Sequence, residues 1–320
     1  MNEACLVTGG AGFIGSALVR GLLKEEKHVR VIDNLSTGNL SNLEDILDRI
    51  EFMERDIRDL DAVQEACKGI TYVFHQAAIP SVPRSIENPI EFNQSNVDGT
   101  LNVLVAARDK GVKRVIYAGS SSVYGDTPVL PKKEDMKPNP LSPYALTKLA
   151  GEYYCKVFSE VYGLETVTTR YFNVFGPRQN PESPYAAVIP KFIDAFLKGE
   201  KPLVFGDGEQ TRDFTFVDNV VYANLLCSRA KRTKGEVINV ATSSRVSLNE
   251  LIKIIKEITG KKIDPVYKDP RKGDIKHSLA DISKAEKMIG YRPLVDLREG
   301  LIKTVRWMKN SGFSEEKILM

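Results

Sequence analysis

The sequence predicts an α/β fold with a doubly wound, mostly parallel sheet and a smaller α/β domain at the C-terminal end. Short apolar runs alternate with amphipathic stretches through the first half of the chain, as in βαβ units. A glycine-rich turn, Gly9–Gly15, joins the first apolar run to the first amphipathic stretch. After about Gly176 the regular alternation stops, and loops rich in proline and glycine separate single helices.

The strands and helices are expected in alternating order. The predicted strands are Cys5–Thr8, Val29–Asp33, Glu51–Arg55, Tyr72–Gln76, Arg114–Ala118 and Thr166–Tyr171. The predicted helices include Ser16–Lys24, Asp61–Ala66, Asn96–Lys110, Pro143–Tyr162 and, in the second half, Ser247–Thr259. A late strand, Glu236–Ala241, is expected to rejoin the sheet. Ligands of such a sheet bind at the carboxyl ends of its strands.

The composition is that of an ordinary globular protein. Its 320 residues are 42% hydrophobic and 27% charged, and the net charge of +3 argues against a dedicated nucleic-acid surface. No apolar run reaches the ~20 residues of a membrane helix, and the chain enters its first strand without a signal peptide. Four scattered cysteines lack metal-ligand spacing, so we expect reduced, packed thiols, no metal and a cytoplasmic location.

The glycine turn predicts a dinucleotide site. Gly9 permits the tight turn after the strand, Gly12 lets a pyrophosphate approach the backbone, and Gly15 lets helix and sheet pack closely. The helix N-terminus then offers amide groups and partial positive charge to phosphates. These features predict a Rossmann domain.

Asp33 ends the second predicted strand, where the ribose of a dinucleotide lies. A carboxylate there accepts hydrogen bonds from both ribose hydroxyls and repels a 2′-phosphate, which favours NAD over NADP. The alternative is that Asp33 is only a turn residue before Asn34. Asp56 follows the third strand at a position suited to the adenine amine, and small residues after Gln76 allow the cofactor to lie close.

Tyr144 and Lys148 predict a catalytic pair. Ser142 is a natural N-cap, so the two side chains lie one helical turn apart on the same face. A nearby ammonium and a positive nicotinamide ring lower the pKa of a phenol, which is a poor base at its usual value near 10. An exposed lysine beside a packed tyrosine is the alternative.

Three serines, Ser120, Ser121 and Ser122, end the fifth predicted strand and are expected to face the same crevice. One of them would hydrogen-bond a sugar hydroxyl and share its proton with Tyr144. The alternative is a loop that is merely rich in small residues.

With these motifs in place, the chain resembles an extended short-chain dehydrogenase/reductase, and within that family a UDP-hexose 4-epimerase. The resemblance rests on GGAGFIG at 9–15, Asp33-Asn34, Asp56-Ile57, Ser120 to Gly125, Tyr144 to Lys148, RYFNVFGPR at 170–178, Arg212-Asp213-Phe214 and RKGD at 271–274. It implies a tightly bound NAD and removal of the 4-hydroxyl proton by the tyrosine while hydride passes to NAD. It also implies a 4-keto sugar that turns over and receives the hydride on its other face.

The resemblance implies a set of site residues in this numbering. The catalytic residues would be Ser120, Tyr144 and Lys148. The cofactor-binding residues would be Gly9, Gly12, Phe13, Ile14, Gly15, Asp33, Asn34, Ser36, Thr37, Gly38, Asp56, Ile57, Gln76, Ala77, Ala78, Ile79, Asn96, Tyr144, Lys148, Tyr171 and Asn173. The substrate-binding residues would be Ser81, Ser121, Ser122, Tyr144, Asn173, Ala187, Val188, Phe205, Arg212, Arg271, Asp274 and Ser278. Asn173, Arg212 and Arg271 would clamp the pyrophosphate, and Asp274 would lie near the nucleotide ribose.

The resemblance also divides the chain. Residues 1–175, with about 214–242 returning to them, would form the NAD-binding Rossmann domain, and 176–320 a partly interleaved UDP-sugar-binding domain. The helices 96–110 and 143–162 would pair across a twofold axis as a four-helix bundle and make a homodimer.

The sugar is expected to be N-acetylated. Ser278 matches the family's gate position, where a tyrosine excludes a 2-acetamido group, and Ala187 and Ser81 are also small. We therefore expect UDP-N-acetylglucosamine and UDP-N-acetylgalactosamine as substrates, with activity on UDP-glucose and UDP-galactose because one missing small group changes binding by only ~1–3 kcal/mol. Pro80 departs from this subgroup, which carries glycine there.

Sister enzymes and other classes stay open. Dehydratases carry Asp-Glu after the catalytic serine or threonine and decarboxylases a glutamate, whereas this chain has Ser121 and Ser122. A ketoreductase, a uronic-acid epimerase with Arg84 or Lys191 as the basic contact, and a non-catalytic nucleotide-sugar sensor are the alternatives. His277, beside the gate, is expected to be a packing or hydrogen-bonding residue.

Overall fold

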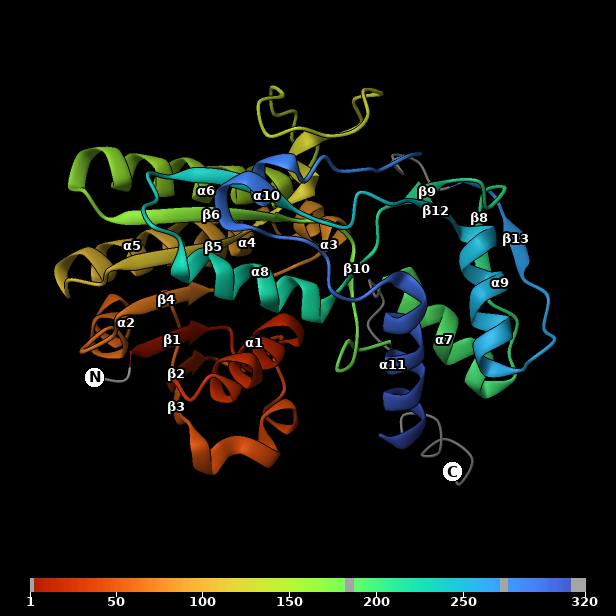
Figure 1. Ribbon diagram of the computed structural model, residues 1–320, viewed down its shortest axis with the longest axis horizontal. Helices are drawn as coiled ribbons and strands as arrows, with labels where there is room; N and C mark the ends of the chain where they lie inside the picture. Colours follow the sequence, from red (N-terminus) through yellow and green to blue (C-terminus); the bar gives the residue numbers. More distant parts are fainter. Residues whose placement is uncertain (1–2, 182–186, 271–275, 312–320) are drawn as a thin grey trace.

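The computed structural model describes residues 3–181, 187–270 and 276–311. Its centre is a seven-stranded sheet in the order β11-β6-β5-β4-β1-β2-β3, in which every neighbouring pair is parallel (Figure 1). The strands are β1 (Ala4–Thr8), β2 (His28–Asp33), β3 (Glu51–Glu54), β4 (Tyr72–His75), β5 (Arg114–Ser120), β6 (Glu165–Tyr171) and β11 (Glu236–Val240). The predicted doubly wound parallel sheet is confirmed, including the return of the late strand, where Ile238 pairs with Thr169.

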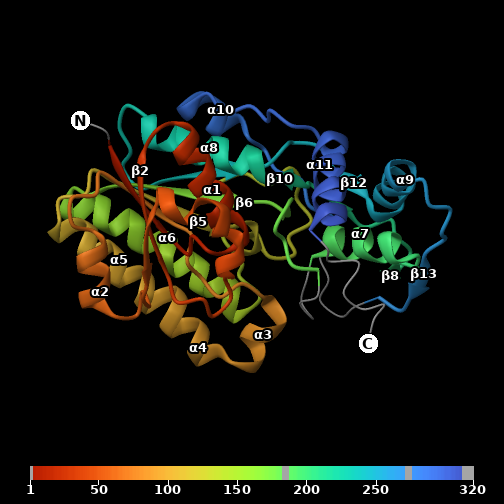
Figure 2. The same cartoon turned by 90° about the horizontal axis from the view of Figure 1, so that it is seen from below.

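Helices cover both faces of the sheet, and Figure 2 shows the sheet between the two layers. One layer contains α1 (Phe13–Lys24), α8 (Val217–Arg229) and α10 (Ser283–Ile289), which share a core with the sheet residues Val7, Val31 and Phe74. The other contains α2 (Leu60–Ala66), α5 (Gly99–Asp109) and α6 (Pro143–Tyr162), packed on Leu6, Val73 and Val115. Burial on both faces is the reason that the strands read as continuous apolar runs.

Several local elements differ from the prediction. The helix expected from Asn96 begins as a π-helical segment, Gln94–Asp98, before α5. Ser121 and Ser122 do not end a strand but lie in a 3-10 turn, η4 (Ser121–Tyr124). Two short helices, α3 (Val82–Glu87) and α4 (Pro89–Asn93), and two 3-10 helices, η1 (Leu40–Asn42) and η2 (Glu44–Arg49), had no clear periodicity in the sequence.

A smaller lobe lies beside the carboxyl ends of the strands, at the right in Figure 1. It contains α7 (Val188–Lys198), α9 (Leu248–Thr259) and α11 (Leu297–Asn310) around buried Phe192, Phe196, Leu251, Ile255 and Leu301. Three strand pairs complete it: β8 (Leu203–Phe205) with β13 (Val266–Lys268), β9 (Thr211–Arg212) with β12 (Val246–Ser247), and β7 (Val174–Phe175) with β10 (Thr215–Phe216). The predicted domain boundary at 175/176 remains a proposal. Phe175, on the N-terminal side of that boundary, packs into the core of this smaller lobe.

Within the described ranges, no helix is long and apolar enough to cross a membrane, and no group of three His, Cys, Asp or Glu side chains is placed to hold a metal. All four cysteines are buried and free, as expected, and burial raises the pKa of each thiol to about 12.

Candidate active site

The turn between β1 and α1 has room only for glycine at two positions. Gly9 has φ of +69°, and a Cβ there would lie 2.7 Å from the Ala77 Cα. A Cβ on Gly15 would lie 2.1 Å from the Gly9 carbonyl oxygen. The N-cap residue of α1 is Gly12, which has no side chain to cap the helix, so the first amide groups of α1 suit an anionic ligand such as a pyrophosphate.

A cavity of about 60 Å³ lies next to this turn. Twelve of the residues predicted to bind the cofactor line it: Gly9, Gly12, Asp33, Asn34, Ser36, Thr37, Gly38, Ile57, Gln76, Ala77, Ala78 and Ile79. They come from the carboxyl ends of β1, β2, β3 and β4 and the loops that follow. The glycine cradle and the uncapped helix fit a dinucleotide.

Asp33 is buried, with 7% of its surface exposed. Its Oδ2 accepts a hydrogen bond from the Ala11 amide at 2.9 Å and its Oδ1 one from the Leu35 amide at 2.8 Å. Burial raises the pKa of this carboxyl, and the two backbone hydrogen bonds oppose the rise. Each oxygen keeps a further lone pair for a ribose hydroxyl.

Asp56 and Asn96 are engaged by the protein itself. Arg58 and Asn34 donate to the Asp56 carboxylate, and the Arg58 hydrogen bonds hold the pKa of Asp56 down at about 2. The buried Asn96 amide exchanges two hydrogen bonds with the backbone of Ile79, at 2.8 and 3.2 Å. Asn96 therefore acts on the cofactor cavity by positioning Ile79, while the predicted adenine contact of Asp56 stays a prediction.

Tyr144 and Ser120 meet at the end of β5. Burial raises the pKa of the Tyr144 phenol, and the neighbouring Ser120 hydroxyl only partly opposes that rise. Lys148 is 3% exposed, its Nζ lies 4.5 Å from the centre of the Tyr117 ring, and burial lowers its pKa to about 8. The expected lowering of the Tyr144 pKa by Lys148 is therefore not visible among the described groups. The positive charge of a nicotinamide ring is the other predicted cause of a lowered Tyr144 pKa.

A second cavity, of about 510 Å³, is lined by two of the predicted catalytic residues, Ser120 and Tyr144. Ser120, Ser121, Ser122 and Tyr144 line one side, and Ser120 Oγ lies 2.8 Å from Ser122 Oγ. Predicted site residues that line the rest are Phe13, Ile14, Tyr171, Asn173, Ala187, Arg212 and Ser278. We call this space the sugar cavity.

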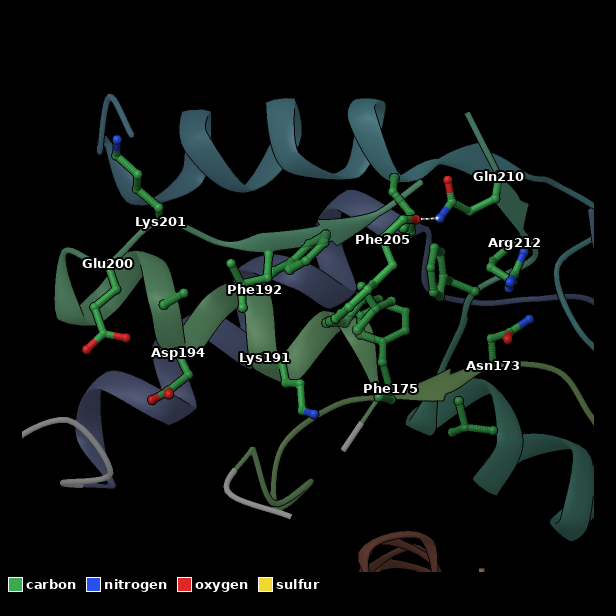
Figure 3. A pocket seen from close by; sticks show the side chains of 18 residues that line it. Asn173, Phe175, Lys191, Phe192, Asp194, Glu200, Lys201, Phe205, Gln210 and Arg212 are labelled. Atoms are coloured by element: carbon green, nitrogen blue, oxygen red, sulfur yellow. Dashed lines mark hydrogen bonds between the residues drawn. The ribbon is translucent and has the colours of Figure 1, made fainter. Parts of the chain in front are cut away.

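A third cavity, of about 520 Å³, adjoins the sugar cavity (Figure 3). Asn173, Val174, Ala187 and Arg212 line both. Figure 3 shows Asn173 and Arg212 at one end and Glu200 and Lys201 at the other, with Phe175, Phe192 and Phe205 between them. Predicted Val188 and Phe205 are here, and Gln210 Nε2 donates to the Phe205 carbonyl at 2.6 Å.

Other predicted residues are placed differently. Ser81 lines none of these three cavities; its hydroxyl caps α3 by accepting from the Arg84 amide at 3.2 Å. Arg271 and Asp274 lie outside the described residues. His277 lines the sugar cavity, and its Nδ1 is hydrogen-bonded to Thr211 Oγ1 at 2.9 Å, which agrees with a hydrogen-bonding role.

The structure adds residues that the sequence analysis missed. Asn224 of α8 donates to the Tyr171 hydroxyl at 2.8 Å, which also contacts Gln76 Nε2 at 3.1 Å. Thr8 and Thr100 bind the two ring nitrogens of buried His75 at 2.7 and 2.9 Å. Lys132 lines the sugar cavity and is 3% exposed. None of these residues belongs to a sequence motif, so the sequence alone does not distinguish them from ordinary core or loop residues.

Comparison with known proteins agrees with this geometry. Residues 5–241 match the model of the "NAD dependent epimerase/dehydratase family". The chain is 43% identical to a putative UDP-glucose 4-epimerase of Methanocaldococcus jannaschii, over 96% of this chain and 99% of the relative. It is 44% identical to a solved UDP-N-acetylglucosamine 4-epimerase from Methanobrevibacter ruminantium M1, in complex with UDP-N-acetylmuramic acid, covering 97% and 99% of the two chains with a TM-score of 0.93.

A UDP-glucuronic acid 4-epimerase from Bacillus cereus, solved with UDP-glucuronic acid and NAD, is 34% identical, with 96% and 99% coverage and a TM-score of 0.89. These similarities extend over nearly the whole chain, and the family model includes the glycine turn, Asp33, the serine cluster, Tyr144 and Lys148. The protein therefore belongs to the NAD-dependent epimerase/dehydratase family, whose members use NAD.

Proposed function

We propose that the protein is a UDP-sugar 4-epimerase acting mainly on UDP-N-acetylglucosamine and UDP-N-acetylgalactosamine, with activity on UDP-glucose and UDP-galactose. The observation that carries the proposal is that Ser120 and Tyr144 line the same side of the sugar cavity, together with Phe13 and Ile14 from the cofactor turn. Such an enzyme is an isomerase, because the hydride removed from C4 returns to the same carbon.

The protein's own residues supply the proton chemistry. Tyr144 takes the 4-hydroxyl proton, and Ser120 holds that hydroxyl and shares the hydrogen bond with the phenol. Bound NAD supplies a reversible hydride acceptor at C4. Lys148, buried one helical turn from Tyr144, adds a positive charge that favours phenolate once it is protonated. The turning 4-keto sugar stays attached through its diphosphate, for which Arg212 and Asn173 are suited donors.

The absence of acids beside Ser120 supports epimerisation over elimination. Ser121 and Ser122 occupy the positions after Ser120, and none of the described residues that line the sugar cavity is Asp or Glu. A dehydratase needs an acid and a base for C5 and C6, and these hydroxyls are poor substitutes at neutral pH. The lining of the cavity therefore favours return of the hydride to C4 over elimination at C5 and C6.

Small side chains support an N-acetylated substrate. Ser278 and Ala187 line the sugar cavity, and the Ser278 amide donates to the Thr211 carbonyl at 3.0 Å, which fixes the segment. A larger side chain at 278 would fill space that an acetamido group needs. We expect Ser278→Tyr to reduce activity on UDP-N-acetylglucosamine by ~10-fold or more while UDP-glucose activity changes little.

The first experiment is incubation of purified protein with UDP-N-acetylglucosamine or UDP-glucose, without added NAD, followed by proton NMR of C4 inversion. Conversion to the galacto forms supports the proposal, and the two rates rank the sugars. If the wild type converts the sugars, Tyr144→Phe is the inactive control. If the wild type binds both sugars but converts neither, even with NAD supplied, the protein would instead be a nucleotide-sugar sensor.

We further propose a homodimer. Leu146, Tyr153, Val157 and Val161 are 57%, 54%, 44% and 65% exposed and recur at intervals of seven, four and four residues, so they form an apolar stripe on α6. A second copy pairing α5 and α6 across a twofold axis would bury this stripe as a four-helix bundle.

A further inference from the structure

Lys132 is a buried cation in the sugar cavity. Among the described residues it forms no ion pair, and the carboxylate whose charge acts on it, Asp126, does not line the cavity. Its side chain lines the cavity with Ser121, Ser122, Tyr144 and Ser278, yet only 3% of the residue is exposed. The ammonium donates to the Thr127 carbonyl, and among the described residues no carboxylate forms an ion pair with it. A buried charge without a partner is costly, so such groups are usually paired.

The backbone holds Lys132 firmly in place. Its amide donates to the Leu279 carbonyl at 2.7 Å, and its carbonyl accepts from the Asp281 amide at 2.9 Å and from Asn239 Nδ2 at 3.0 Å. These bonds join Lys132 to β11 and to the segment that carries Ser278. An ammonium has three donors, and the Thr127 carbonyl uses one, so two remain for a ligand.

The charge of the cavity selects the ligand's chemistry. The described lining residues include the cations Lys132 and Arg212 but no carboxylate. Arg212 also lines the adjoining cavity, and its guanidinium suits the diphosphate of a UDP-sugar. The second cation is then left to the sugar end, together with Ser121 and Ser122.

We infer that Lys132 binds a carboxylate carried by the sugar, so that the site accepts acidic UDP-sugars as well as neutral ones. The inference rests on the proposed function, because it assumes that the sugar of a UDP-sugar occupies this cavity. It also replaces the basic residues that the sequence suggested for a uronic acid. Arg84 is already paired with Glu91 at 2.9 Å, and Lys191 lines the adjoining cavity.

The test compares neutral and acidic ligands in pairs by titration calorimetry. UDP-glucose and UDP-glucuronic acid differ by a carboxylate at C6, whereas UDP-N-acetylglucosamine and UDP-N-acetylmuramic acid differ by a carboxylate on an ether at C3. The wild-type protein is expected to bind at least one acid as tightly as its neutral partner. Which pair responds identifies the position of the carboxylate.

Lys132→Gln is expected to weaken binding of that acid by about 30-fold or more, because truncating one partner of a buried charge pair is costly. Binding of the neutral sugars should change by less than ~3-fold. Lys133→Gln is the matched control. The Lys133 side chain is next in the sequence but is 55% exposed, and its Nζ lies 3.9 Å from Asp281 Oδ2. Lys132→Arg keeps the charge and should retain the preference.

Three results would overturn the inference. In the first, the wild-type protein binds neither acid. In the second, Lys132→Gln weakens the binding of neutral and acidic ligands equally, as a purely structural role of Lys132 would. In the third, the acids bind equally well to the wild type and to Lys132→Gln. If neutral UDP-sugars are epimerised while any of these results holds, the inference fails and the proposed function stands. If no UDP-sugar binds at all, both fail.

Discussion

At the residue scale, Tyr144 and Ser120 have separable effects. We expect Tyr144→Phe to lower kcat for C4 inversion by about 10³-fold, because it removes the base, and Ser120→Ala by about 10–100-fold, because the phenol remains. Both variants should bind UDP-sugar within ~3-fold of wild type, since they leave the proposed diphosphate contacts of Arg212 and Asn173 unchanged. NMR rates and calorimetric affinities check this. Equal kcat for wild type and Tyr144→Phe would exclude the tyrosine as the base.

Lys148 is expected to raise the rate of C4 inversion while lowering the free energy of unfolding. Burial lowers its pKa from 10.5 to about 8, so the unfolded chain binds more protons between these pH values and the free energy of unfolding rises with pH across that window. Below pH 8 the cost of the buried charge is fully present. Lys148→Met should therefore unfold with a free energy on the order of 3 kcal/mol higher than wild type at pH 7, with the gap closing towards pH 10.5.

Urea unfolding of nucleotide-free protein from pH 7 to 10.5 measures this, and C4 inversion by the same variant should fall at least 100-fold. Lys156→Met is the control, because that side chain is 56% exposed on the same helix. A Lys148→Met protein with lower stability at pH 7 and no change of the gap with pH would contradict the argument.

At the element scale, His75 ties β4 to β1 and α5. Thr100 Oγ1 donates to the Asn96 carbonyl at 2.7 Å, so it accepts from His75 Nε2–H at 2.9 Å, and Nδ1 then accepts from Thr8 Oγ1 at 2.7 Å. The Ala77 amide donates to Thr8 Oγ1 at 3.1 Å, which fixes the start of the cofactor loop. The arrangement requires neutral imidazole.

Acid should therefore weaken this junction. Burial, with a smaller contribution from Lys148, lowers the pKa of His75 from 6.5 to about 3. The stability that neutral His75 provides is fully present above pH 6.5 and is lost as the pH falls towards 3, by up to ~1.4 kcal/mol per pH unit. His75→Gln should be ~1–3 kcal/mol less stable at pH 7 but flatter between pH 6.5 and 4.

Urea midpoints over that range compare wild type with His75→Gln, and His28→Gln is the control because its side chain is 61% exposed. Identical pH slopes in wild type and His75→Gln would show that protonation of His75 does not limit acid stability.

The elements of the sheet could be predicted because burial on both faces makes each strand an uninterrupted apolar run. β11 pairs with β6 although 64 or more residues separate them; its apolar run indicated that it rejoins the sheet, but not which strand it pairs with. The π-helical segment at Gln94–Asp98 was not predictable, because the Asn96 amide bonds to Ile79 only in the folded chain. Ser121 and Ser122 turn into η4 because the Ser120 hydroxyl accepts from the Ser122 amide, a local choice that serine composition does not reveal.

At the scale of the whole molecule, the site combines segments that are distant in sequence. The glycine turn between β1 and α1, and the placement of Tyr144 and Lys148 on one helix, were predictable from local spacing. Lys132 was not, because its burial arises from contacts with the segment 279–281 and with Asn239, about 107 residues or more away. Residues whose arrangement depends on local spacing can thus be predicted from the sequence, whereas the balance of charges inside a cavity can be known only from the folded structure.

The proposed dimer depends on the apolar stripe of α6. Glutamate at Val157 and Val161 would place two desolvated charges in the bundle, so the double variant Val157→Glu/Val161→Glu is expected to be monomeric in sedimentation equilibrium at concentrations where wild type is dimeric. Leu294→Glu is the control, because Leu294 is 63% exposed but lies outside α5 and α6.

Tyr144 lies on the same helix, but it lines the sugar cavity, whereas none of the exposed residues of the stripe does. A monomeric variant is therefore expected to keep its substrate affinity within ~3-fold but to lose free energy of unfolding, because the exposed apolar area is no longer covered. A wild-type protein that sediments as a monomer at all concentrations would refute the dimer and leave the stripe to another partner.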